Sequence, residues 1–194
     1  MKTIRVDLYE YDELSETAKD AVLDNMRGIN TDDFDWWDFA FEDYKECGRL
    51  MGIDITNICF SGFSSQGDGA CFEGDYSYNK GARTAIKGYA GTDKELHRIA
   101  EDLFQIQRKH FFRLTAHVEQ SGHYYHKYST VFDITDSETG DYVDCDELIE
   151  VLRDFMQWMY KHLEAEYDGL RSDEAVIDTI EANEYYFTEN GELK

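Results

Sequence analysis

The sequence predicts an α+β fold in which an antiparallel sheet of about four to six strands has helices packed on one face or end. Two observations lead to this fold class. Stretches with two-residue alternation of apolar side chains come in neighbouring pairs, and amphipathic stretches of helical period lie between and after those pairs. The chain of 194 residues is 42% hydrophobic, enough for a substantial core. We expect a single domain over 1–194, in which 144–184 can form a helical C-terminal appendage.

The first part of the chain predicts one strand and two helices. Apolar residues alternate along 3–9, which is typical of a strand. Ser15 is a favoured N-cap for a helix that ends near Gly28. A second helix is expected from Thr31 to about Met51, where Gly52 follows.

Two hairpins with a helix between them occupy the middle of the chain. Segments 53–60 and 70–78 read as the strands of the first hairpin. A capping box at 92–95 predicts a helix after it. Segments 112–119 and 124–134 alternate as the second hairpin, with Leu114, Ala116 and Val118 expected to point inward.

The C-terminal part predicts two further helices. A second capping box at 144–147 begins a long helix that Gly169 is expected to end. A short acidic helix follows over 172–182, and 185–188 can be a closing strand.

The net charge of −23 is distributed unevenly. There are 14 acidic and 3 basic residues from Asp7 to Glu46, and 19 acidic and 4 basic residues from Asp133 to Lys194. The balance reverses between Lys80 and Lys127, with 5 acidic and 9 basic residues. Such a surface repels nucleic acid and attracts a basic partner, including a protein whose own ligand is nucleic acid. A solvated surface without a partner is the alternative.

Neither a membrane span nor a secretory leader is predicted. No apolar run reaches the roughly 20 residues that a transmembrane helix needs, and the N-terminus has no apolar segment typical of a signal peptide. The four cysteines are widely separated, with no CxxC pair. We therefore expect a cytoplasmic protein with reduced thiols.

Two predicted helices have rows of carboxylates at steps of three and four residues. Carboxylates four residues apart rise about 6 Å along the helix, comparable to the spacing of phosphates along a nucleic acid strand. The rows are candidates for DNA mimicry, and ordinary solvated helix faces are the alternative. The candidate residues are Asp35, Asp38, Glu42, Glu46, Glu174, Asp178 and Glu181. Adjacent helical residues differ by about 100° in direction, so Trp36 is expected to border a groove or partner surface while Trp37 packs inward.

The stretch FSGFSSQGDGACFEG, residues 60–74, joins the strands of the first hairpin. It lacks the lysine of a P-loop and the spacing of a nucleophile elbow. The favoured interpretation is a hairpin loop in which Asp68 binds its own turn amides. The alternative is a binding loop for a nucleotide-like ligand, assisted by basic residues that follow it. The residues of that alternative are Ser64, Ser65, Gln66, Asp68, Lys80 and Arg83.

Catalytic and metal chemistry find little support in the sequence. His117, His123 and His126 surround the second hairpin, but they lack the helical spacing of a zinc protease. Cys71 lies inside a predicted strand, where cysteine is usually a small hydrophobic residue. We expect no catalytic residue, no metal and no cofactor.

Three segments resemble a known family: DDFDWWDFAFEDYKECGRLMGIDI, FSGFSSQGDGACFEG and DKELHRIAEDLFQIQRKHF. The family comprises small acidic proteins of bacteriophages and prophage-rich genomes, some labelled as antitoxins of toxin–antitoxin stability systems. The resemblance covers roughly residues 14–134. It implies a phage setting, in which small acidic proteins often block host defences such as restriction or CRISPR complexes.

The leading hypothesis is a non-enzymatic protein of the bacterial host cytoplasm that binds and inhibits a basic, nucleic-acid-handling defence protein or complex. The acidic rows provide long-range attraction, and direct contact with nucleic acid or membrane is not expected. The alternatives are a module for a nucleotide-like ligand and an antitoxin.

Overall fold

The computed structural model describes residues 5–32 and 35–194. The chain divides into two compact units. We call residues 1–36 with 165–194 the terminal unit, and residues 37–164 the sheet unit. The predicted helical appendage covered only residues 144–184. The second compact unit instead combines the N-terminal residues 1–36 with the C-terminal residues 165–194.

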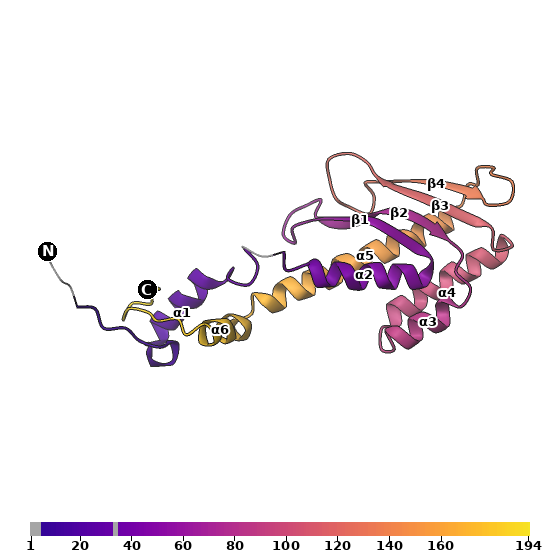
Figure 1. The fold of residues 1–194 in the computed structure, drawn as a ribbon. Helices are drawn as coiled ribbons and strands as arrows, with labels where there is room; N and C mark the ends of the chain where they lie inside the picture. Colours follow the sequence, from indigo (N-terminus) through magenta and orange to yellow (C-terminus); the bar gives the residue numbers. More distant parts are fainter. Residues whose placement is uncertain (1–4, 33–34) are drawn as a thin grey trace. The chain divides into compact units, whose positions relative to one another are not determined.

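The sheet unit is built on a four-stranded antiparallel sheet in the order β1-β2-β3-β4 (Figure 1). Its strands are β1 (Ile53–Ser61), β2 (Gly69–Ser77), β3 (Leu114–Gln120) and β4 (Thr130–Asp136). The four strands and the helices around them confirm the α+β fold class that the sequence predicts.

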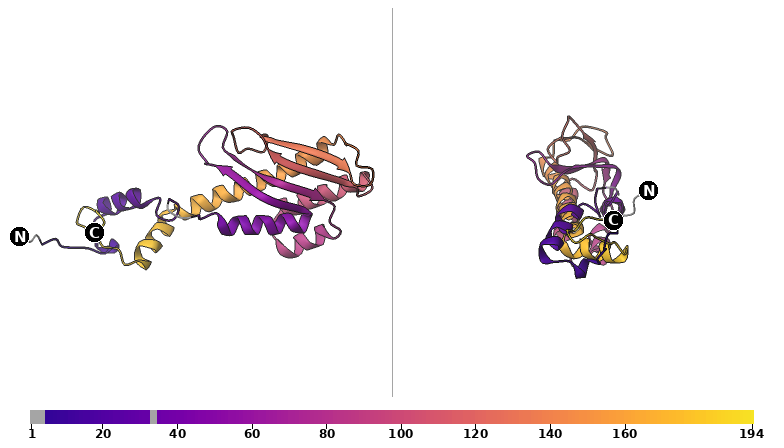
Figure 2. Two further views of the ribbon diagram at one scale, coloured as in Figure 1. Left: turned by 45° about the horizontal axis from the view of Figure 1, so that its top comes forward. Right: turned by 90° about the vertical axis from the view of Figure 1, so that its left-hand side faces the viewer.

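The helices of the sheet unit lie on one side of the sheet (Figure 1 and Figure 2). They are α2 (Asp38–Met51), α3 (Ala82–Tyr89), α4 (Lys94–Lys109) and the sheet-unit part of α5 (Asp146–Leu170). Leu114, Ala116 and Val118 are buried on this side, as predicted. Phe72 of β2 meets Phe155 of α5 with ring centroids 6.0 Å apart. The alternation of apolar residues along the strands therefore directs one face of the sheet to the helices.

The other face of the sheet is polar and carries a row of ionisable residues across all four strands. The strand register places Asp54 beside Asp75, Asp75 beside His117, and His117 beside Asp133. All four are exposed. This face is thus solvated while the opposite one forms the core.

The terminal unit contains a short 3₁₀ turn, η1 (Tyr11–Glu13), and two helices, α1 (Glu16–Met26) and α6 (Asp173–Ala182). Its core brings together the two ends of the chain, with Val22 from α1 and Val176 and Ile180 from α6 among its buried members. Both helices start at serine caps, of which Ser15 was predicted. Ser15 accepts a hydrogen bond from the Ala18 amide, and Ser172 accepts one from the Ala175 amide.

The predicted strands at the two ends of the chain are wrong. Residues 5–8 are exposed and form no ladder, and Ile4 lies outside the described residues. Of residues 5–9, only Tyr9 pairs with another segment, through a single antiparallel β-bridge to Phe187. Phe187 forms a second β-bridge, to Leu193. Alternation alone cannot make a strand here, because no neighbouring strand continues the hydrogen bonding beyond one residue pair.

The second helix starts at Asp38 rather than near Thr31. Thr31 is buried, and its hydroxyl donates a hydrogen bond to the Gly28 carbonyl in the turn after α1, so it does not cap α2. Phe34 lies outside the described residues. The predicted end is correct, because Gly52 has φ 91° and a Cβ there would lie 2.1 Å from the Ser77 carbonyl oxygen.

Three other boundaries differ from the predictions. The N-cap of α4 is Asp93 rather than Thr92. Gly169 lies inside α5, which continues to Leu170. The return strand of the second hairpin begins at Thr130, since 124–129 form a loop. In addition, the sequence does not predict the eight-residue helix α3. None of the helices in the described ranges is long and apolar enough to cross a membrane.

Candidate functional site

The acidic row expected on α2 is largely neutralised by its own helix. Lys45 donates a hydrogen bond to Glu42 at 3.0 Å, and Arg49 donates two to Glu46 at 2.7 and 2.6 Å. Hydrogen bonding from Arg49 holds the pKa of Glu46 below its usual range. Asp38 is exposed in the first turn of the helix. Two of the carboxylates expected in this row, Glu42 and Glu46, are thus paired with cations that follow them at three-residue spacing.

Asp35 and Trp36 belong to the terminal unit, whereas Trp37, directly before α2, belongs to the sheet unit. Asp35 is exposed and precedes the helix, so it does not extend the row along α2. Trp36 is half-buried, and its ring centroid lies 5.7 Å from that of Tyr167. Trp37 meets Phe60 of the sheet unit at 5.3 Å. The two tryptophans therefore contact different partners.

The acidic row on α6 has no such neutralisation. Glu174, Asp178 and Glu181 are exposed, and none makes an ion pair with another described residue. The helix does hold one ion pair at its start, where Arg27 binds Asp173. The row is thus an exposed, negatively charged surface on this helix.

A pocket of about 360 Å³ opens beside the end of α6 in the terminal unit. Its wall comes from residues 10–12 and from the chain around the end of α6. Four carboxylates and three tyrosines dominate the wall, and none of the described lining residues is basic. The lining residues are Glu10, Tyr11, Asp12, Ile180, Glu181, Glu184, Tyr185 and Tyr186.

Glu184 enters this pocket wall from an unfavourable backbone conformation. It has φ 53°, in the left-handed region that glycine usually occupies after a helix. The Glu184 amide donates to the Glu181 carbonyl at 3.0 Å, and the Tyr185 amide donates to the Ile180 carbonyl at 3.2 Å. This is the Schellman pattern, and a residue with a Cβ in its left-handed position costs about 1 kcal/mol.

The potential around the pocket is negative. Burial raises the pKa of Tyr11, and the carboxylates of Asp173, Glu16 and Asp20 raise it further. The terminal unit contains 19 acidic and 6 basic residues, a net charge of −13. Carboxylates beside tyrosine rings can receive an ammonium or guanidinium group by ion pairing and cation–π attraction. The pocket is thus suited to a lysine or arginine side chain.

The 62–68 loop of the FSGFSSQGDGACFEG stretch is held by Asp68, as the favoured interpretation predicts. The Asp68 carboxylate accepts hydrogen bonds from the Ser64 amide at 2.9 Å and from the Ser65 amide at 2.6 Å. Ser64, Ser65 and Gln66 are exposed. Gly67 has φ 98°, which allows the turn to close. Asp68 is therefore engaged in shaping the turn.

The alternative ligand site is not one site. Ser64 to Asp68 precede β2, and Lys80 and Arg83 follow it. The strand between them spans about 26 Å at 3.3 Å per residue. A combined site of the loop and these basic residues is wrong, because the extended strand holds them at opposite ends.

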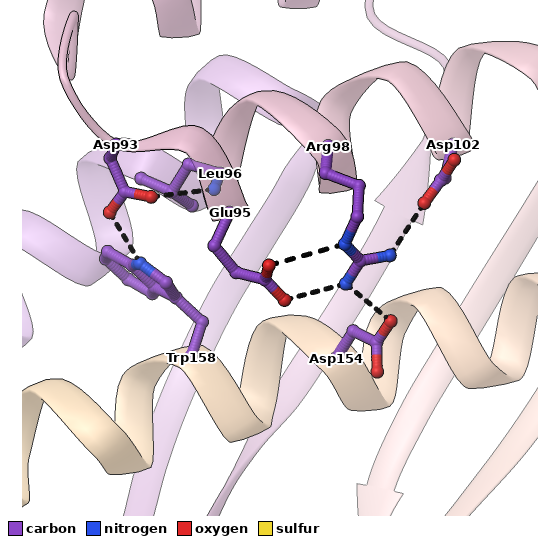
Figure 3. Close-up of polar contacts among 7 residues, drawn as sticks. All are labelled: Asp93, Glu95, Leu96, Arg98, Asp102, Asp154 and Trp158. Atoms are coloured by element: carbon purple, nitrogen blue, oxygen red, sulfur yellow. Dashed lines mark hydrogen bonds and ion pairs between the residues drawn. The ribbon is translucent and has the colours of Figure 1, made fainter.

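A polar cluster that the sequence interpretation did not identify joins α4 to α5 (Figure 3). Arg98 binds Glu95 at 2.7 Å, Asp102 at 2.7 Å and Asp154 at 2.8 Å. Hydrogen bonding to Glu95, with a further contribution from Asp154, raises the pKa of Arg98. The Arg98 guanidinium forms ion pairs with carboxylates of both helices and thereby holds α4 against α5.

Asp93 makes the second part of this contact (Figure 3). One of its carboxylate oxygens accepts a hydrogen bond from the Leu96 amide at 2.9 Å and caps α4. The other accepts one from Trp158 Nε1 at 2.8 Å, and His162 Nε2 lies 3.6 Å from the same oxygen. The sequence signal here was the capping box at 92–95, which placed the cap one residue too early, and the indole partner of Asp93 lies 65 residues further along the chain.

The histidines near the second hairpin do not converge. His117 places its ring nitrogens 2.7 Å from Asp75 and 3.1 Å from Glu119. Hydrogen bonding to these carboxylates, Asp75 first, raises its pKa. Over the described part of the chain, no group of three or more His, Cys, Asp and Glu side chains is arranged to hold a metal ion.

A family model described as "Domain of unknown function (DUF8835)" matches residues 36–173. The chain belongs to the DUF8835 family. No curated protein and no solved structure matches the chain. The DUF8835 segment contains the whole sheet unit, whereas every lining residue of the acidic pocket lies outside it.

Proposed function

We propose that this protein binds a basic segment of a partner protein through its terminal unit. The observation that carries the proposal is the pocket with four carboxylates, three tyrosines and no basic lining residue among those described. The free row of Glu174, Asp178 and Glu181 on α6 ends at this pocket, since Glu181 belongs to both. A cationic side chain in the pocket and further cations along α6 would share one continuous surface.

The chemistry of the pocket favours arginine and lysine over a polar uncharged side chain. A guanidinium or ammonium group gains an ion pair with a carboxylate and cation–π attraction to a tyrosine ring. Glu184 adds a carboxylate here despite the cost of its left-handed backbone. A functional role for the side chain would account for a residue that is less favourable than glycine at this position.

The charge of the terminal unit would also act at long range. With 19 acidic and 6 basic residues it attracts cations well before contact, and such attraction raises association rates and weakens with salt. Proteins that handle nucleic acid have basic surfaces of the complementary kind. Inhibition of a host defence complex is the part of the proposal that rests on the resemblance to phage proteins. Binding of a basic toxin, as in an antitoxin, would use the same chemistry.

The test is a titration of the full chain into a fluorescein-labelled arginine-rich peptide, followed by anisotropy. We expect saturable binding that weakens as NaCl rises from about 50 to about 300 mM. The double variant Glu181→Gln/Glu184→Gln should bind at least about tenfold more weakly, as expected for the loss of charge-assisted contacts.

The matched control is Glu189→Gln/Glu192→Gln, which removes the same charge from the same unit outside the pocket. It should change the affinity by no more than about twofold, as exposed charges contribute little. Equal weakening by both double variants would show diffuse attraction and would contradict a site at the pocket.

A further inference from the structure

A second pocket, of about 300 Å³, lies in the sheet unit between the end of β2, the first turn of α3 and one side of α4. Its apolar part includes Met51, Ala100 and Leu103, and its aromatic part includes Tyr78 and Phe104. The volume suits a small ring-containing ligand rather than a macromolecule.

The charge of this pocket is opposite to that of the chain. Its charged lining residues are Lys80 and Arg83, and no described carboxylate lines it. Lys80 is exposed and makes no ion pair with a described residue. In a chain of net charge −23, a pocket with two cations and no acid concentrates anions locally.

Arg83 is fixed in place by two neighbours, Phe104 and Glu101. Its guanidinium carbon lies 3.6 Å from the centre of the Phe104 ring. The same guanidinium binds Glu101 at 3.1 Å, and Gln105 donates a hydrogen bond to Glu101 at 2.5 Å. The arginine therefore forms a preorganised planar wall, and Lys80 is the cation that is free to meet a ligand.

The aromatic wall is continuous with a cluster behind it. The Tyr78 ring lies 4.5 Å from that of Phe112, and the Phe104 ring lies 5.8 Å from that of Phe112. Phe112 has φ 62°, a strained backbone conformation for a residue with a side chain. In this conformation the Phe112 ring packs against the rings of Tyr78 and Phe104. Rings supported in this way offer a rigid surface for stacking.

The start of α3 completes the site. Gly81 precedes the helix with φ 96°, and no side chain caps the helix. A Cβ placed at Gly81 would meet nothing within 4 Å, so the backbone is open to an approaching group. The Ala82 and Thr84 amides donate to the Asn79 and Gly81 carbonyls, so the amides that can favour an anion beside Lys80 are those of Gly81 and Arg83.

We propose that this pocket binds a nucleoside monophosphate, with the base against Tyr78 and Phe104 and the phosphate at Lys80 and the start of α3. The aromatic wall selects for a planar ring, and Lys80 beside the open backbone of Gly81 selects for a phosphate. This site is independent of the acidic pocket of the terminal unit, so either proposal can fail alone.

The test is titration calorimetry of the full chain with AMP, GMP, CMP and UMP, with adenosine and inorganic phosphate as partial probes. We expect at least one nucleoside monophosphate to bind in the millimolar range or tighter, and to bind at least about tenfold more tightly than adenosine or phosphate. Backbone amide NMR shifts should move most at residues 80–84.

Lys80→Glu should weaken this binding at least about tenfold, because it replaces the phosphate-binding cation with a like charge. The matched control is Lys87→Glu in α3, whose exposed side chain does not line the pocket. The Lys87→Glu variant should change the dissociation constant for the nucleoside monophosphate by no more than about twofold. No binding of any of the four monophosphates would overturn the proposal, as would equal binding of phosphate alone or equal loss in both variants.

Discussion

Glu184 lowers the stability of the fold through its backbone conformation and adds a carboxylate to the surface of the acidic pocket. Its φ of 53° follows α6 in the position where helices usually place glycine. Two Schellman hydrogen bonds around it are intact, so the backbone needs the left-handed conformation whatever the residue. The carboxylate that the glutamate adds lines the acidic pocket.

Glu184→Gly should therefore change stability and binding in opposite directions. Relief of the left-handed strain should raise the free energy of unfolding by about 1 kcal/mol, because glycine has no Cβ to clash. Loss of the carboxylate should weaken binding of the arginine-rich peptide. Urea denaturation and anisotropy measure the two effects, and a variant that is more stable and binds equally well would remove Glu184 from the site.

His117 makes the stability of the sheet unit depend on pH. Ionised carboxylates only accept hydrogen bonds, so two carboxylate partners imply that both ring nitrogens carry protons. Its pKa in the folded chain is accordingly raised above the ordinary value of 6.5. The stabilisation is therefore fully present below about pH 6.5 and is lost as the pH rises through the raised pKa.

The expected result is a pH-dependent difference between the natural chain and His117→Gln. The natural chain should exceed the variant in stability by more at about pH 5.5 than at about pH 8.5, since only the charged imidazole gains from its partners. Urea denaturation at both pH values gives the difference. A difference that is constant with pH, or larger at the alkaline end, would contradict the charged hydrogen-bonded state.

At the scale of elements, α4 is positioned against α5 by its first residues. Asp93 caps α4 and accepts the Trp158 indole proton with its second oxygen. Arg98 then binds Asp154 one turn further along. A cap that also reaches the neighbouring helix couples the start of one element to the packing of another.

Asp93→Ala should be destabilising by about 2 kcal/mol, because it removes the cap and leaves the N–H of the buried Trp158 without its acceptor. Asp102→Ala on the same helix removes only an exposed partner of Arg98 and should cost about 0.5 kcal/mol. Chemical denaturation compares the two variants. Equal losses would show that the Asp93–Trp158 contact adds nothing to an ordinary surface charge.

The elements that the sequence could predict are those with a local signal. Ser15 and Ser172 mark helix starts by their caps, and the alternation at Leu114 to Val118 marks a buried strand face. Tyr9 shows the limit, because an alternating segment becomes a strand only when a partner strand lies beside it. Helix α3 is only eight residues long and begins after a glycine without a side-chain cap, so its start signal was weak.

The candidate sites were less predictable, because tertiary structure assembles them. Glu181 was predicted from its helical row, whereas Glu10 and Glu184 joined it only through packing of the chain ends. Neutralisation of Glu42 and Glu46 could have been predicted, since Lys45 and Arg49 follow each by three residues. The separation of Asp68 from Lys80 likewise follows from the length of β2 once that strand is recognised.

At the scale of the whole molecule, charge is divided between the two units. The terminal unit has a net charge of −13 in 66 residues, and the sheet unit has −10 in 128. The higher charge density thus belongs to the smaller unit, most of which lies outside the DUF8835 match. In the two proposals, the terminal unit attracts the basic partner and the sheet unit binds the small anion.

Carboxyl footprinting tests the central claim most directly. A carbodiimide and an amine would label the exposed carboxylates of the full chain with and without the arginine-rich peptide, and mass spectrometry would locate the labels. The account predicts protection at Glu10, Asp12, Glu181 and Glu184, with Asp38 and Glu42 labelled as before. Protection spread evenly over the carboxylates, or confined to residues 37–164, would contradict it.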